Sequence, residues 1–280
     1  MKIQTIKSAD LPEVLQNIPN PPEKLFSLGE ELKNERRITI VGTRKPTPYG
    51  REVTEMLARD LTNAGAVIVS GLALGIDSIA HQACLDAGGR TIAVLPCGLD
   101  AIYPASHRNL AKDILAQNGT LLSEYDKGTE AFKSNFRERN RLVSGLSEAV
   151  IITEAAERSG TSITAGFALE QGKDVYVVPG NITSPSSKGT NGLISQGANV
   201  ITSSSSLIEQ LNLTPSEKRQ LTGDSELETL ILNLIQEGVR DGSKLQFGSG
   251  VGVSEFNQAI TMMEVTGKIR SIGSNQWTIT

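Results

Sequence analysis

The sequence lacks the marks of a membrane protein and of a disulfide-stabilised one. No apolar run approaches the roughly 18 consecutive residues that a membrane-spanning helix needs, so we expect no transmembrane segment. The N-terminal residues contain no long apolar stretch of the kind found in secretory signals, which predicts a cytoplasmic protein. The two cysteines, Cys84 and Cys97, form no Cys-x-x-Cys pair, so neither a disulfide framework nor a structural zinc site is expected.

The sequence also has no excess of positive charge and no common nucleotide-binding motif. Its 27 Lys and Arg residues face 31 Asp and Glu residues, a net charge of -4, but nucleic-acid binding depends on where charges lie. It contains neither the P-loop motif of ATPases nor a Gly-x-Gly-x-x-Gly motif after its first predicted strand. The two histidines form no recognisable Ser/His/Asp triad. We therefore expect no catalytic residue, metal or cofactor.

What the sequence does contain is an alternation of short apolar runs and amphipathic stretches over residues 38–212. The runs are almost continuously apolar, as is typical of strands buried on both faces. This alternation predicts an α/β fold with a doubly wound parallel sheet, and residues 1–37 are predicted to be a short lead-in. The predicted strands are 38–41, 67–69, 91–95, 120–122, 149–152, 175–178 and 199–201, and the predicted helices are 49–63, 76–87, 106–117, 136–146, 161–171 and 191–196.

The last part of the chain has a different pattern. Residues 213–224 contain Pro215, Gly223 and several charged residues, which predicts a linker. Over residues 225–280, two stretches with helical apolar spacing flank a Gly-rich segment and are followed by a predicted hairpin at 269–279. Helices followed by a terminal hairpin predict a small winged-helix-like domain.

Glycine, serine and threonine follow most of the predicted parallel strands. Because the carboxyl ends of such strands meet at one edge of the sheet, these residues are predicted to form one extended rim. Glycine lets a ligand approach the backbone, hydroxyl groups donate hydrogen bonds, and helix N-termini attract anions. A tight turn explains any single glycine, but the set favours a phosphate-rich ligand, either a nucleotide or a polynucleotide. The candidate residues are Gly42, Thr43, Arg44, Ser159, Gly160, Thr161, Gly180, Gly189, Thr190 and Asn191.

Two stretches concentrate positive charge. Residues 36–51 contain five basic residues and no acidic one, and residues 133–141 contain four basic residues, one acidic residue and Phe136. Cations beside an aromatic ring suit single-stranded nucleic acid, because they offer contacts for both phosphates and a base. The same spacing fits a helix that packs Phe136 in the core and pairs its arginines with nearby acids, so both interpretations stay open.

Five motifs occur in order along the chain, and as a set they carry a family resemblance. They are Ile-Val-Gly-Thr-Arg at 40–44, Ser-Gly-Leu-Ala-Leu-Gly-Ile-Asp at 70–77, Tyr-Pro at 103–104 with His107, Asn-Phe-x-x-Arg-Asn-Arg at 135–141, and Val-Pro-Gly at 178–180 with Gly-Thr-Asn at 189–191. Together they resemble the DprA/Smf family, the DNA-processing proteins of bacterial transformation, over roughly residues 20–211.

This resemblance implies an extended Rossmann-like domain that binds single-stranded DNA, forms a homodimer and helps to load the RecA recombinase, without being an enzyme. Arg44 and Lys133 would hold phosphates, and Phe136 would contact a base. Thr43, Ser159, Gly160, Thr161 and the turn 189–191 would contact the DNA backbone. The same site is expected to include the remaining motif residues, Gly42, Asn135, Arg139, Asn140 and Gly180.

Two other functions remain possible at this point. One is a nucleotide-binding Rossmann enzyme of the LOG-type phosphoribohydrolase group, although residues 153–161 lack the double glycine of that group's Pro-Gly-Gly-x-Gly-Thr motif. The other is a duplex-DNA binder that uses the winged-helix-like end. The six basic and eight acidic residues of 215–280 argue against strong duplex binding by that end.

Overall fold

The computed structural model describes residues 2–157, 159–214, 222–236, 239–273 and 275–279. The chain divides into two compact units, Met1–Ser216 and Glu217–Thr280, which are described separately. Most of the predicted linker 213–224 falls on residues 215–221, which lie outside the described residues. None of the helices in the described ranges is both long enough and apolar enough to cross a membrane.

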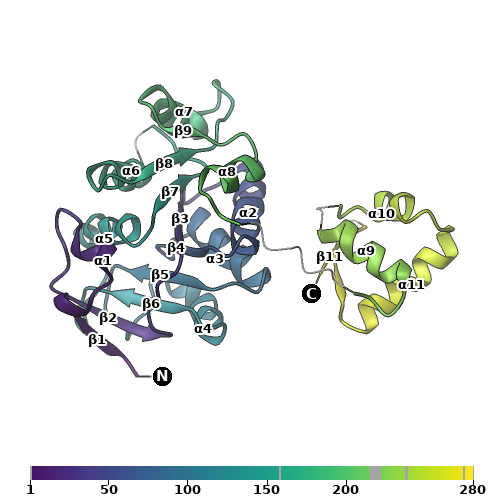
Figure 1. Cartoon of the computed structure of the whole chain (residues 1–280), viewed down its shortest axis with the longest axis horizontal. Helices are drawn as coiled ribbons and strands as arrows, with labels where there is room; N and C mark the ends of the chain where they lie inside the picture. Colours follow the sequence, from purple (N-terminus) through teal and green to yellow (C-terminus); the bar gives the residue numbers. More distant parts are fainter. Residues whose placement is uncertain (1, 158, 215–221, 237–238, 274, 280) are drawn as a thin grey trace. The chain divides into compact units, whose positions relative to one another are not determined.

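The first unit is built around one large sheet (Figure 1). Its described strands lie in the order β1-β2-β6-β5-β4-β3-β7-β8-β9. Neighbours from β6 through β9 are parallel, whereas β1 with β2 and β2 with β6 are antiparallel. The chain order runs outward from β3 through β4, β5 and β6 on one side and from β7 through β8 to β9 on the other, so it reverses between β3 and β7, which confirms the predicted doubly wound α/β sheet. The strands are β1 (Gln4–Lys7), β2 (Lys24–Gly29), β3 (Arg37–Val41), β4 (Val67–Ser70), β5 (Thr91–Leu95), β6 (Thr120–Ser123), β7 (Ala149–Ile152), β8 (Asp174–Val177) and β9 (Asn199–Val200).

Helices cover both faces of this sheet. They are α1 (Glu13–Gln16), α2 (Pro48–Asn63), α3 (Ile76–Asp86), α4 (Arg108–Ala116), α5 (Lys133–Gly145), α6 (Gly160–Glu170), α7 (Lys188–Ser195) and α8 (Ser204–Gln210). Val150 and Ile152 of β7 join an apolar core with residues of α1, α5 and α6. Ala149 and Ile151 of the same strand join a separate core with residues of α2, α3 and α8. Both faces of the strand are therefore buried, which explains why the central strands have continuous apolar sequences.

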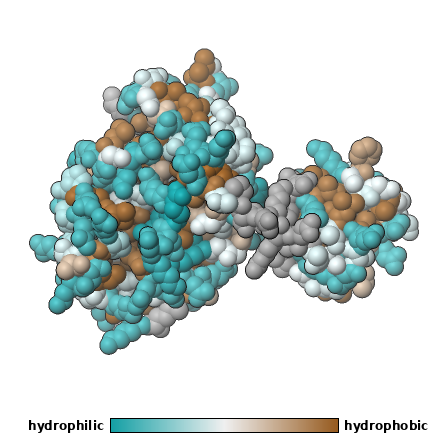
Figure 2. Space-filling view, in the orientation of Figure 1, coloured by the Kyte–Doolittle hydropathy of each residue, from teal (hydrophilic) through white to brown (hydrophobic). Residues whose placement is uncertain are grey.

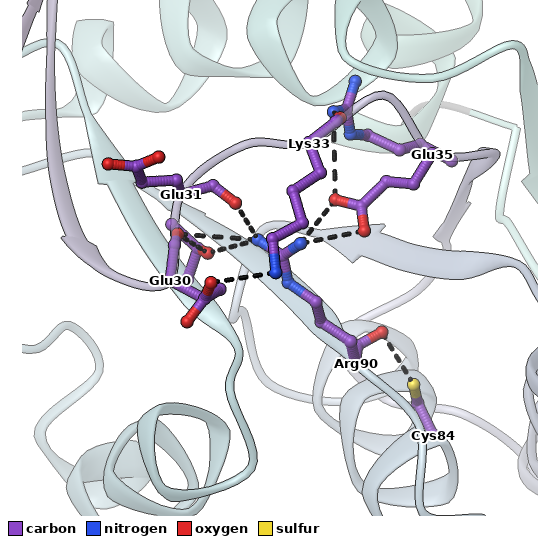
Figure 3. A network of polar contacts seen from close by, with 8 residues as sticks. Glu30, Glu31, Lys33, Glu35, Cys84 and Arg90 are labelled. Atoms are coloured by element: carbon purple, nitrogen blue, oxygen red, sulfur yellow. Dashed lines mark hydrogen bonds and ion pairs between the residues drawn. The ribbon is translucent and has the colours of Figure 1, made fainter.

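Residues 4–29, within the predicted lead-in 1–37, contribute strands β1 and β2 to this sheet. β1 is almost entirely exposed at the sheet edge, and it therefore lacks the apolar run that marks the central strands. Figure 3 shows how the segment before β3 is fixed to the start of β5. The Arg90 guanidinium donates to both carboxylate oxygens of Glu35 at 2.6 and 2.8 Å and to the Glu31 carbonyl at 2.7 Å. The Lys33 ammonium pairs with Glu30 at 2.9 Å.

The second unit contains helices α9 (Glu226–Gln236), α10 (Gly242–Ser249) and α11 (Val253–Val265) and the antiparallel strands β10 (Ile269–Gly273) and β11 (Gln276–Ile279). Ile231, Leu245, Phe256 and Met263 lie in its core. The Asp241 side chain caps α10 by accepting a hydrogen bond from the Lys244 N–H at 3.0 Å. The two predicted helical stretches correspond to α9 and α11 and the predicted hairpin to β10 and β11, whereas α10 lies in the Gly-rich segment for which no helix is predicted. The winged-helix class stays a prediction. Apolar residues are exposed on the visible face of both units (Figure 2).

Candidate nucleic-acid interface

The carboxyl ends of the parallel strands form the rim in which the candidate site lies. β3 is followed by Gly42, Thr43 and Arg44, and the neighbouring β7 is followed by Thr153 and Glu154. The two loops are in contact, since the Thr43 N–H donates to the Glu154 carbonyl at 2.8 Å. The strand order reverses between these two strands, and such a reversal is where open α/β sheets bind ligands.

Glu154 is bound into the start of α2 and is not available to act as an acid or base. Its side chain is 3% exposed, and one carboxylate oxygen accepts a hydrogen bond from the Thr47 N–H at 2.8 Å. Thr47 in turn caps α2 by accepting from the Gly50 N–H at 3.1 Å. Any side chain at Gly50 would collide with the Glu154 carboxylate. A negative charge therefore already lies at this helix N-terminus, where a phosphate would otherwise be attracted.

Arg44, Tyr103 and Phe136 form a cluster next to this loop. The Arg44 guanidinium carbon lies over the Phe136 ring, 5.2 Å from its centroid, which is a cation–π contact. The Tyr103 ring packs edge-to-face against Phe136, with centroids 5.3 Å apart and planes at 73°. Arg44 and Tyr103 are exposed and Phe136 is half-buried. The three residues come from the loop after β3, the loop after β5 and the start of α5, so the fold brings them together.

Lys133 adds positive charge beside this cluster. It is exposed and is the first residue of α5, three positions before Phe136, so the two side chains are neighbours on the helix surface. Arg44, Tyr103, Lys133 and Phe136 are called the open half of the rim below. Its groups match those that bind single-stranded nucleic acid, namely cations for phosphates and aromatic rings for bases.

Two other residues predicted from the same motif, Asn135 and Arg139, point inward, so their burial gives no support to their assignment as direct DNA contacts. The Asn135 amide is buried and donates to the Pro96 carbonyl at 3.1 Å. Arg139 is 3% exposed, and its guanidinium donates to the carbonyls of Gly71 and Val94, at the ends of β4 and β5. It has no free surface for a phosphate. Asn140, which follows, is half-buried and its side chain accepts from Arg139 Nε at 3.2 Å.

A buried polar layer lies beneath the open half and consists of Arg139, Asp77 and His81. Burial lowers the pKa of Arg139 to about 10, against the opposing effect of Asp77. Burial also raises the pKa of Asp77, although Arg139 and the backbone N–H groups of Gly71 and Ala73 favour its charged form. Burial lowers the pKa of His81 to about 3, so this ring is neutral and pairs with the Thr91 hydroxyl at 2.7 Å. The layer joins α3, α5 and the central strands.

The other end of the rim consists of small residues that pack against each other. The Asn191 amide accepts from the Gly180 N–H at 3.2 Å and donates to the Gly180 carbonyl at 3.0 Å. Gly189 donates its N–H to the Ala155 carbonyl at 2.8 Å, and a side chain there would strike that backbone. Thr190 is 1% exposed and donates its hydroxyl to the Ser187 carbonyl at 3.1 Å. Gly180, Gly189, Thr190 and Asn191 are called the packed half, and the Thr190 side chain is not available to a ligand.

The start of α6 lies between these two halves in sequence. Ser159 precedes the helix without capping it, and Gly160 is exposed. Within the described part of the chain, the buried Ser159 hydroxyl has no hydrogen-bond partner. The Thr161 side chain is 6% exposed and lies inward. Backbone N–H groups at Ser159 and Gly160 are therefore the groups that this turn can offer to an anion.

Comparison with known proteins identifies the chain. A model of the family described as DNA recombination-mediator protein A matches residues 2–212. The chain belongs to this family. DNA processing protein DprA of Bacillus subtilis (strain 168) is 45% identical over 208 residues, covering 74% of this chain and 70% of that protein. Protein Smf of Synechocystis sp. is 42% identical over 228 residues, covering 78% of this chain and 57% of that protein.

A solved structure of a DprA protein has the same fold. The structure of DNA processing protein A from Helicobacter pylori, described for its unique single-stranded DNA binding mode, superposes with a TM-score of 0.70 at 39% identity. It covers 76% of this chain and 96% of that one. The Rossmann-like fold of the first unit and the DprA/Smf resemblance are thus confirmed. DprA proteins are recombination mediators rather than enzymes.

Within the DprA family assignment, the structure separates the two positively charged stretches. Arg36 and Arg37 lie at the start of β3 and Arg44 follows its end, so the five-residue strand separates them by roughly 16 Å. Arg36 pairs with Glu148 at 2.7 Å, and Arg37 is buried. In α5, Lys133 and Arg137 are exposed whereas Arg139 and Arg141 are buried. Neither stretch is therefore one continuous binding patch.

The sequence does not place Tyr103 in the cluster with Arg44 and Phe136. The Tyr-Pro motif contributes to the family resemblance, but nothing in its spacing predicts that Tyr103 lies beside Phe136. The signal available in the sequence is weak: Tyr103 is an aromatic residue in the loop after the predicted strand 91–95, at the same sheet edge as the other candidates. Among the described residues, no group of three or more His, Cys, Asp or Glu side chains is placed to hold a metal ion.

Proposed function

We propose that this protein binds single-stranded DNA along the rim of its first unit and acts as a recombination mediator. The observation that carries the proposal is the open half, where Arg44 and Lys133 supply positive charge around the half-buried ring of Phe136. Single-stranded DNA requires this combination, because its phosphates and its unpaired bases are contacted at the same time. A nucleotide offers fewer phosphates and would leave part of the charged surface unused.

The roles of the rim residues divide by their surroundings. Arg44 and Lys133 contact phosphates, and Phe136 contacts a base. Gly42, Thr43, Ser159 and Gly160 line the rim beside them and offer backbone or hydroxyl groups. Thr161, Gly180, Gly189, Thr190 and Asn191 shape the far end of the rim through their packing.

Membership of the family supports a wider proposal about function. The chain covers 70% and 57% of the two relatives named above, and their complete activities are extended to it here as proposals. We propose that it works in natural transformation as a cytoplasmic homodimer that protects incoming DNA and helps to load RecA. The acidic second unit is proposed to be a winged-helix domain that contacts protein rather than duplex DNA, because α11 contains two acidic residues and no basic one.

The test is a salt titration of DNA binding with full-length protein. Wild type is expected to bind oligo-dT more tightly than duplex DNA of equal length, with an affinity that falls steeply as salt rises. Arg44→Ala and Lys133→Ala should each weaken oligo-dT binding by roughly tenfold, because each loses a charge-assisted contact. Each should also reduce the slope of log affinity against log salt by about 0.7.

Matched controls lie in the second unit. Arg270 is exposed, and Lys244 is exposed in the first turn of α10, much as Lys133 is in α5. Arg270→Ala and Lys244→Ala should bind oligo-dT like wild type. Equal affinities for wild type, Arg44→Ala and Lys133→Ala at every salt concentration would show that the site lies elsewhere.

A LOG-type phosphoribohydrolase is not favoured. Such an enzyme needs a free carboxylate beside its phosphate site, and the Glu154 carboxylate is buried and bonded to the Thr47 N–H. Release of free adenine from AMP by the purified protein is therefore expected to be undetectable.

A further inference from the structure

The more exposed aromatic ring of the open half is Tyr103, and not Phe136, which the family resemblance implies as the base contact. Tyr103 is 44% exposed, whereas Phe136 is half-buried and contacts both the Arg44 guanidinium and the Tyr103 ring. We infer that Tyr103 is a second base-contacting residue and that, together with Phe136, it selects single-stranded over duplex DNA. This inference rests on the proposed function and concerns how the same site recognises its ligand.

The geometry of the two rings gives the reason for selectivity. Their centroids are 5.3 Å apart and their planes differ by 73°. Bases that lie flat on each ring would be turned from one another by a similar angle. A single strand can adopt such a turn, because its bases are free to unstack. Duplex DNA cannot do so without losing stacking and pairing, because its adjacent bases lie parallel about 3.4 Å apart.

The loop that carries Tyr103 is fixed at both ends, so the ring is already positioned. On one side, the Asp100 carboxylate accepts a hydrogen bond from the Gly128 N–H at 3.0 Å. On the other side, His107 Nδ1 lies 2.9 Å from the Leu72 carbonyl. A ring that needs no ordering on binding loses little conformational entropy, and therefore contributes more of its stacking energy to affinity.

A supporting role for Tyr103 is the alternative, in which it only keeps Phe136 in place. The two roles differ in how substitutions combine. If each ring contacts its own base, the losses from removing each ring add; if Tyr103 acts through Phe136, removing Tyr103 has no effect once Phe136 is gone. Leucine is a suitable replacement for both, because it keeps apolar volume and removes the aromatic face.

The experiment measures the affinity of full-length Tyr103→Leu, Phe136→Leu and the double variant for oligo-dT and for duplex DNA of equal length. Tyr103→Leu is expected to weaken oligo-dT binding roughly 5-fold or more, the effect of losing one stacked base. It should leave duplex affinity and the salt slope unchanged, because no phosphate contact is lost. The double variant should show the product of the two single losses, and Tyr103→Phe should bind like wild type.

Phe247→Leu serves as the matched control, since Phe247 is an exposed ring of the second unit and its loss should not change binding. Thermal unfolding checks that each variant is folded. If Tyr103→Leu binds oligo-dT like wild type while Arg44→Ala is weakened, the inference is wrong and the proposed function stands. A double variant no weaker than Phe136→Leu also overturns it. If wild type itself does not prefer oligo-dT to duplex DNA, the proposed function fails.

Discussion

The open half and the packed half of the rim follow the same kind of strand end, yet their side chains have different surroundings. On the open half, Arg44 and Tyr103 are exposed and both contact the ring of Phe136. On the packed half, Thr190 is buried and Asn191 bonds both backbone groups of Gly180. A ligand on the rim would therefore contact charged and aromatic side chains on the open half and mainly backbone groups on the packed half.

This difference separates two effects that a substitution can have. Changes on the open half remove exposed groups, so we expect them to weaken DNA binding with little effect on folding. Changes on the packed half or in the buried polar layer remove internal hydrogen bonds, so we expect them to lower the free energy of unfolding more than they lower DNA affinity. The predictions below test this separation.

The largest effect is expected for Arg139→Met. Removing this buried guanidinium leaves the carbonyls of Gly71 and Val94 without their partner and Asp77 without its nearby positive charge. The free energy of unfolding, measured in urea, should fall by about 3–5 kcal/mol. Arg137→Met is the matched control, because Arg137 is exposed on the same helix. If Arg139→Met were as stable as this control and lost only DNA affinity, Arg139 would belong to the open half.

A smaller effect concerns pH. The pKa of His81 is about 3 in the folded protein, below its ordinary value of 6.5, so the unfolded state binds more protons between these values. Stability is therefore lost as the pH falls below about 6.5. The loss from this group should reach about 2 kcal/mol at pH 5. Asp77, Arg139 and His107 also act on this region.

The measurement compares urea unfolding of wild type and His81→Gln at pH 8 and pH 5. The variant should lose less stability over this range, because glutamine does not titrate. The contribution of Asp77, whose raised pKa acts in the opposite direction, is common to both proteins and cancels from the difference. Identical losses in the two proteins would mean that His81 does not remain neutral in the folded state.

The smallest of these effects is expected for Asn191→Ala. It removes two part-buried hydrogen bonds to Gly180 and should lower the free energy of unfolding by about 1 kcal/mol. The affinity of the folded variant for oligo-dT should stay close to that of wild type, because the open half is unchanged. Anisotropy titration below the unfolding temperature checks this. A large loss of affinity at unchanged stability would instead make Asn191 a direct DNA contact.

Much of the first unit could be predicted from the sequence. Its central strands were recognisable because burial on both faces requires continuous apolar runs, as in residues 149–152. β1 was not, because an exposed edge strand has no such run. In the candidate site, Arg44 and Lys133 were predicted on the surface and are exposed. Asn135 and Arg139 were predicted there too and are buried. The sequence of a motif does not show whether a polar residue lies on the surface or makes hydrogen bonds in the interior.

The sequence by itself determined the α/β class, the family and the edge of the sheet at which the candidate residues lie. These follow from local patterns, namely apolar periodicity and short motifs at strand ends. Only the tertiary structure decided which motif side chains are exposed, and that Tyr103 joins Arg44 and Phe136. Both depend on contacts between segments far apart in the chain, and the spacing of residues along one segment does not specify such contacts.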